Sequence, residues 1–65
     1  MTTIYLFKVI GENSEIYGEE FLTELENASK QEHIDYAHRL FPNEKIRCYG
    51  KLTEFEAEMM GIDTY

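Results

Sequence analysis

Thr3-Ile4-Tyr5-Leu6-Phe7-Lys8-Val9-Ile10 is the one long run of the chain with apolar residues at both alternating positions. Successive side chains of a strand point to opposite faces, so the odd positions from Tyr5 to Val9 share one face and the even positions from Ile4 to Ile10 share the other. A strand that is apolar on both faces is usually covered on both. The run therefore predicts the central strand of a sheet, and it leaves open which face packs on a helix.

Local signals divide the rest of the chain into four further elements and a short C-terminal tail. Ser29 and Glu32 have the spacing of a capping box, and Pro42 ends the helix that follows. Thr53 starts a second helix with the same spacing, and Gly61 is suited to its left-handed end. We predict strands at about 3–10, 19–26 and 45–52, helices at about 28–41 and 54–60, and a tail at 61–65.

These elements predict one α+β domain with a ββαβα order. A hairpin followed by a right-handed helical crossover places the third strand beside the first, antiparallel to it. The expected sheet is three-stranded and antiparallel, in the order 2-1-3, with the main helix on one face and a short C-terminal helix. The third strand alternates, with Ile46, Cys48 and Leu52 on one side and a basic stripe on the other: Lys45, Arg47, Tyr49 and Lys51.

Few chemical functions fit 65 residues with one cysteine and two histidines. Cys48 cannot form an internal disulfide, and His33 and His38 point in different directions on the predicted helix, where both are expected at the surface. We expect no metal site, cofactor or catalytic centre. A domain of this size gains little from its core alone, so oligomerisation or a partner is the expected source of further stability. Phe55 and Met59 are expected to face the core.

The composition is that of a folded protein, with 43% hydrophobic residues despite a net charge of -7. No apolar run is long enough for a membrane span, and the N-terminus lacks the features of a signal peptide. A single unpaired cysteine fits a reducing compartment. We therefore expect a cytoplasmic location.

Charge is strongly segregated along the chain, because ten of the 13 acidic residues lie either between Lys8 and Lys30 or after Leu52, where no basic residue occurs. We do not expect such a chain to bind nucleic acid directly unless the basic stripe suffices. The acidic residues fit either a docking surface for a basic partner or a solvating, edge-protecting surface. The candidate partner-binding residues are Glu19, Glu20, Glu24, Glu26, Glu54, Glu56 and Glu58.

The chain is small and acidic, with an apolar strand Ile4–Ile10, a charged hairpin, a capped helix ending at Phe41 and a basic strand Lys45–Leu52. This layout resembles small phage-encoded accessory proteins, among them anti-CRISPR and antirestriction inhibitors. The resemblance covers about the first 52 residues. It is architectural, and no functional residue is transferred from it. It implies a stoichiometric inhibitor in the host cytoplasm that occupies the basic nucleic-acid-binding surface of a host defence complex. A dimerising or structural subunit with apolar contacts is the alternative.

Overall fold

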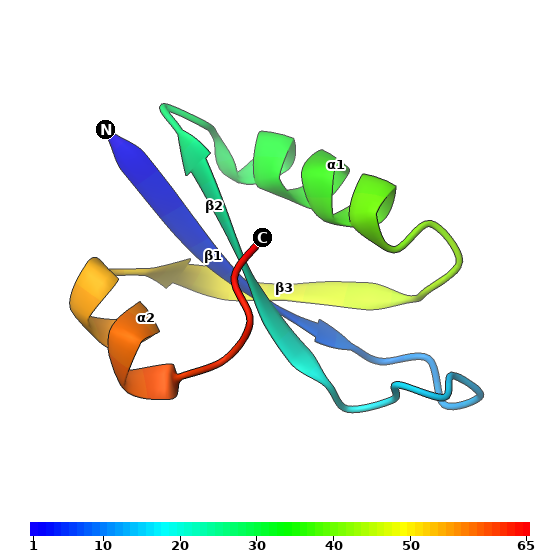
Figure 1. The fold of residues 1–65 in the computed structure, drawn as a ribbon. Helices are drawn as coiled ribbons and strands as arrows, with labels where there is room; N and C mark the ends of the chain where they lie inside the picture. The colour runs from blue at the N-terminus through cyan, green and yellow to red at the C-terminus, as the bar shows by residue number, and fades with distance from the viewer.

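The structure, a computed structural model, describes all 65 residues as a three-stranded antiparallel sheet with two helices. The strand order is β2-β1-β3, which confirms the predicted α+β fold with order 2-1-3. In Figure 1, α1 lies above the sheet, α2 lies on the opposite side, and the C-terminal segment crosses in front of β2. The elements are β1 (Thr2–Val9), β2 (Glu20–Glu26), α1 (Lys30–Leu40), β3 (Ile46–Leu52) and α2 (Glu54–Met60).

Both helices begin at a capping box, as predicted. Ser29 accepts a hydrogen bond from the backbone N–H of Glu32, whose side chain accepts one from the Ser29 backbone. Thr53 and Glu56 make the same reciprocal pair at the start of α2. The first helix starts two residues later than the predicted position 28, because Ser29 is its N-cap and lies outside the helical turns.

The main core lies between α1 and the Tyr5/Phe7/Val9 face of β1, which answers the question of which face the helix covers. Phe7, Val9, Phe21 and Ala37 are buried there. The rings of Phe7 and Phe21 stack with their centroids 5.5 Å apart. Six partly buried residues surround this cluster: Tyr5, Ile16, Ile34, Phe41, Ile46 and Cys48.

The predicted C-terminal tail is hydrogen-bonded to β2, along the outer edge of the three-stranded sheet. The N–H of Leu22 donates to the Asp63 carbonyl at 2.8 Å, and the N–H of Tyr65 donates back to Leu22 at 2.8 Å. The segment runs parallel to β2 and makes one bridge, between Leu22 and Thr64. On this second face Ile4 and Leu22 are buried. Both faces of the sheet therefore carry buried residues within one chain.

A β-bulge divides β3 and changes which residues share a face. Leu6 lies opposite Gly50 but Phe7 lies opposite Cys48, so Tyr49 is the additional residue. Gly50 has φ = 138°, a backbone conformation that favours glycine. The prediction that Leu52 shares a face with Ile46 and Cys48 is therefore wrong, because the side chains after the bulge point the other way.

Candidate functional site

Three predicted partner-binding glutamates from two distant parts of the chain line one open cavity of about 370 Å³. Glu24 comes from β2, and Glu54 and Glu58 come from α2. The remaining lining residues are mostly small or apolar, and we call this site the acidic cavity: Ile4, Ala57, Gly61, Ile62 and Thr64 complete it.

Secondary structure brings these carboxylates together. Glu24 lies opposite Ile4 in the β1–β2 ladder, so its side chain emerges on the sheet face away from α1. Glu54 and Glu58 are four residues apart on α2 and share one side of that helix. The capped end of α2 at Gly61 turns the chain towards β2, where residues 63–65 bind. The acidic cavity thus depends on the tail being bound.

No basic group neutralises the acidic cavity. The one salt bridge in the structure joins the Met1 ammonium to Glu26 at 2.6 Å, outside the cavity. No group of three or more histidine, cysteine, aspartate or glutamate side chains is arranged to hold a metal ion. The acidic cavity therefore offers free carboxylates above an apolar floor, an arrangement suited to a basic side chain with an aliphatic stem.

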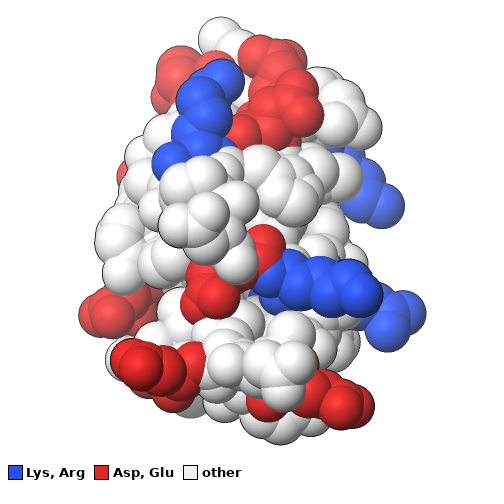
Figure 2. Space-filling view, turned by 90° about the vertical axis from the view of Figure 1, so that its right-hand side faces the viewer, with Lys and Arg blue, Asp and Glu red and all other residues white.

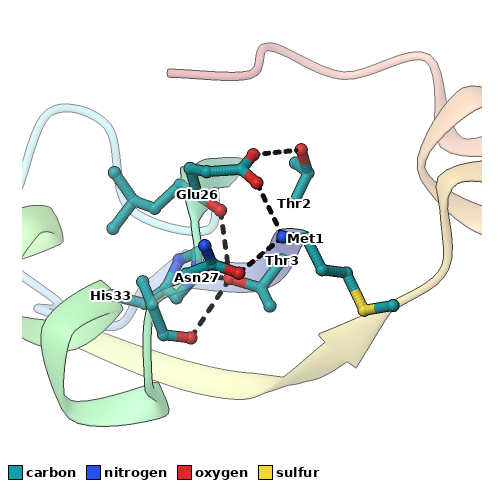
Figure 3. A network of polar contacts seen from close by, with 8 residues as sticks. Met1, Thr2, Thr3, Glu26, Asn27 and His33 are labelled. Atoms are coloured by element: carbon teal, nitrogen blue, oxygen red, sulfur yellow. Dashed lines mark hydrogen bonds and ion pairs between the residues drawn. The ribbon is translucent and has the colours of Figure 1, made fainter.

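Two of the other predicted partner-binding residues have local structural contacts. Glu26 accepts hydrogen bonds from the Met1 ammonium at 2.6 Å and from the Thr2 hydroxyl at 2.8 Å (Figure 3). The hydrogen bond from the ammonium, followed by that from Thr2, lowers the pKa of Glu26 below its usual value. Glu56 accepts a hydrogen bond from the Thr53 backbone in the capping box. Both carboxylates are exposed, but each already accepts at least one hydrogen bond within the chain.

Glu19 and Glu20 lie apart from the acidic cavity, at the other end of β2. Glu20 is opposite Lys8 in the ladder, but no salt bridge joins the two side chains. Figure 2 shows this end of the molecule, where acidic and basic side chains are interspersed over the surface. The seven predicted glutamates therefore do not form one continuous surface.

The basic stripe of β3 is also divided. Arg47 lies over the ring of Tyr49, 5.6 Å from its centroid, on the sheet face away from α1. Lys51 lies opposite Tyr5, on the α1 side, because it follows the bulge. The predicted stripe is therefore wrong as a continuous surface.

His33 is fully buried, so the prediction that it lies at the surface is wrong. Its Nε2 is 2.6 Å from the Thr3 hydroxyl and its Nδ1 is 2.6 Å from the Thr23 hydroxyl. Thr3 and Thr23 come from β1 and β2, and His33 comes from α1. The spacing of His33 and Ala37, one helical turn apart on the buried side of α1, was a signal in the sequence for this position.

The hydrogen bonds around His33 are satisfied by a neutral ring. The Thr3 hydroxyl donates to the backbone carbonyls of Leu25 and Ala28, both at 3.2 Å, so Thr3 accepts from Nε2–H. Thr23 then donates to the unprotonated Nδ1. Burial lowers the pKa of His33, Glu32 raises it to a smaller extent, and Lys51 lowers it further. His33 is thus a structural residue that holds α1 on the sheet.

A second large cavity, of about 520 Å³, lies between the loop 10–14 and residues 43–45. Its lining is almost entirely polar, and the Ser14 hydroxyl donates to Glu44 across it. Nothing in this loop pair provides an apolar floor, which distinguishes it from the acidic cavity.

No helix of the structure has the length and apolar character needed to cross a membrane. Comparisons of the chain with protein-family models, with curated protein sequences and with solved structures gave no match.

Proposed function

We propose that the protein is a non-enzymatic binding module that docks on a basic, nucleic-acid-binding surface of another protein and inhibits it stoichiometrically. The architectural resemblance described above gives the class of partner, a host defence complex. The observation that carries the proposal is the acidic cavity, in which Glu24, Glu54 and Glu58 surround an apolar floor with no basic group of the chain beside them.

The acidic cavity suits one arginine or lysine side chain of the partner. The methylene stem of such a residue packs on Ile4, Ala57 and Ile62, and its charged end reaches the carboxylates at the rim. Hydrogen bonds between a guanidinium group and carboxylates are about twice as strong as neutral ones. The cavity therefore supplies an anchor, and the other exposed glutamates supply a surrounding negative field.

The net charge of -7 supports the same mode of binding. A negative protein approaches a positive surface faster than a neutral one, and salt screens the attraction over about 10 Å at 0.1 M ionic strength. Binding should therefore weaken as the salt concentration rises.

An arginine-rich peptide of defined sequence, labelled with a fluorophore, is a suitable probe for this site. The variant Glu24→Gln/Glu54→Gln/Glu58→Gln removes the three carboxylates of the acidic cavity. The matched control, Glu12→Gln/Glu15→Gln/Glu19→Gln, removes three exposed carboxylates of the hairpin, so both variants have the same net charge. Fluorescence anisotropy then compares the three proteins at several salt concentrations.

We expect the cavity variant to bind the peptide at least about tenfold more weakly than the control, which corresponds to about 1.4 kcal/mol. Equal affinities for the two variants would show that only net charge matters and would remove the cavity as the binding site. Circular dichroism at the same time confirms that both variants are folded.

A further inference from the structure

The outer side of α2 exposes large apolar side chains, contrary to the prediction that Phe55 and Met59 face the core. Phe55 is 71% exposed and Met59 is 72% exposed. They are four residues apart, so they form one continuous apolar strip on a helix that has no fully buried residue. Such a strip is a surface that another molecule can cover.

The same side of the sheet as α2 is only partly covered. Leu6 and Lys8 follow Ile4 on this face of β1, and Arg47 lies opposite Lys8. Tyr49, in contact with Arg47, is 51% exposed. These four residues, Leu6, Lys8, Arg47 and Tyr49, form what we call the open half of the sheet, because none of them is fully buried, whereas Ile4 and Leu22 of the same face are.

The α2 strip is flanked only by acidic residues, whereas the open half of the sheet contains the basic residues Lys8 and Arg47, with Glu20 opposite Lys8. Glu54, Glu56 and Glu58 flank the strip, and α2 contains no basic residue. Lys8 and Arg47 make no salt bridge within the chain. Direct packing of one α2 against another would bring like charges together, whereas packing of α2 on the open half would bring opposite charges together.

We propose that a second copy of this chain covers the open half of the sheet with its α2, in a symmetric dimer. Both surfaces lie on the same side of the sheet, so a single two-fold rotation places each α2 on the open half of the other copy. Phe55 and Met59 of one copy then pack against Leu6 and Tyr49 of the other, and the α2 glutamates lie near Lys8 and Arg47.

The size of the chain favours such a dimer. Only six hydrophobic residues are buried in the single chain, and small domains of this kind commonly gain stability by oligomerisation. A standard interface buries roughly 800 Å² on each partner, about a sixth of the 4579 Å² that this chain exposes. Two α2 contacts related by symmetry make that area attainable.

Sedimentation velocity of the wild-type protein over a wide range of concentration tests the dimer. We expect a monomer–dimer equilibrium that shifts to monomer in the variant Phe55→Ala/Met59→Ala and, separately, in Arg47→Glu/Tyr49→Ala. All four side chains are at the surface, so neither variant should lose its fold, which thermal unfolding checks. Tyr17→Ala is the matched control, because Tyr17 is 58% exposed but lies in the hairpin loop.

Mixing the two dimer variants tests the geometry. Each has one damaged and one intact surface, so the mixed pair regains one of the two α2–sheet contacts and should associate at least about tenfold more tightly than either variant alone. If the mixture stays as monomeric as its components, or if the wild type is a monomer at millimolar concentration, the proposal is wrong. Both variants keep Glu24, Glu54 and Glu58, so the affinity of each monomeric variant for the arginine-rich peptide measures the acidic cavity without a second copy beside it.

Discussion

His33 lies where α1 meets two threonines of the sheet, and it is the largest polar side chain in the core. Its ring also lies against Tyr5, with the centroids 4.5 Å apart. In the neutral ring each nitrogen has a partner of the correct kind, one accepting and one donating. Protonation would give Nδ1 a hydrogen and leave the Thr23 hydroxyl without its acceptor.

We expect this arrangement to make the protein sensitive to mild acid. The pKa of His33 is lowered in the folded state, mainly by burial. At pH values between this lowered pKa and the pKa of 6.5 in the unfolded chain, the unfolded chain therefore binds more protons than the folded protein. The stabilising contribution is therefore complete above pH 6.5 and decreases as the pH falls through the folded pKa. One proton gives a slope of at most about 1.4 kcal/mol per pH unit.

Urea unfolding at intervals between pH 7.5 and pH 5 measures this slope. The variant His33→Gln should be less stable but should lose the slope. The control His38→Gln removes an exposed histidine and should keep it. A wild-type stability that stays constant or rises as the pH falls to 5 would contradict the structural role assigned to His33.

Among the elements, β3 depends most on a single backbone conformation. The bulge at Tyr49 and Gly50 rotates the strand so that Leu52 covers the second face of the sheet opposite Ile4, while Ile46 and Cys48 remain under α1. It also separates Lys51 from Arg47. One residue thus determines both the packing and the charge distribution of the strand.

Replacing Gly50 by alanine should therefore destabilise the protein. A Cβ at this position meets no atom within 4 Å, so the cost comes from the backbone at φ = 138° and not from a steric clash with neighbours. We expect a loss of about 1–3 kcal/mol in the free energy of unfolding, measured in urea. A loss below about 0.5 kcal/mol, the range of ordinary surface substitutions, would show that the bulge does not require glycine.

The two helices should respond differently to loss of their caps. Ser29→Ala removes the cap of α1, which carries the buried residues His33 and Ala37, so we expect global stability to fall by about 1 kcal/mol. Thr53→Ala removes the same kind of cap from α2, which has no buried residue. We expect mainly faster amide exchange within α2, with a smaller change in global stability.

Hydrogen exchange followed by NMR, together with urea unfolding, distinguishes these outcomes. An equal loss of global stability in the two variants would mean that α2 unfolds together with the sheet, contrary to its few buried contacts.

The elements themselves were predictable because their signals are local. The apolar run of β1, the two capping boxes and Gly61 each depend on a few neighbouring residues, and the structure has each of them. The antiparallel order followed from the handedness of one crossover. The orientation of α2 was not predictable, because seven residues give too short a period to choose between the Ala57 side and the Phe55 side.

The features that were missed depend on contacts between distant segments. The helical spacing of His33 and Ala37 indicates the buried side of α1, but the hydrogen-bond partners of His33, Thr3 and Thr23, come from two paired strands, which no local pattern reveals. The acidic cavity forms because residues 63–65 bind β2 and bring α2 beside Glu24. The bulge had one visible signal, a glycine inside an alternating strand, which commonly marks such an irregularity.

At the scale of the whole molecule, the charge pattern is better described as three regions than as one acidic surface. The acidic cavity has free carboxylates. At the N-terminal end of the sheet, Glu26 pairs with the Met1 ammonium. The hairpin end carries both acidic and basic side chains. A partner with a basic surface should therefore contact the protein mainly from the side of α2.

Titration of the ¹⁵N-labelled protein with the arginine-rich peptide, followed by two-dimensional NMR, shows which side of the protein the peptide contacts. We expect the largest chemical-shift changes at the residues lining the acidic cavity, among them Ile4, Glu24, Ala57 and Ile62, and small changes at Glu12, Glu15 and Glu19. Shift changes of equal size at all exposed glutamates, or confined to the hairpin, would contradict the account.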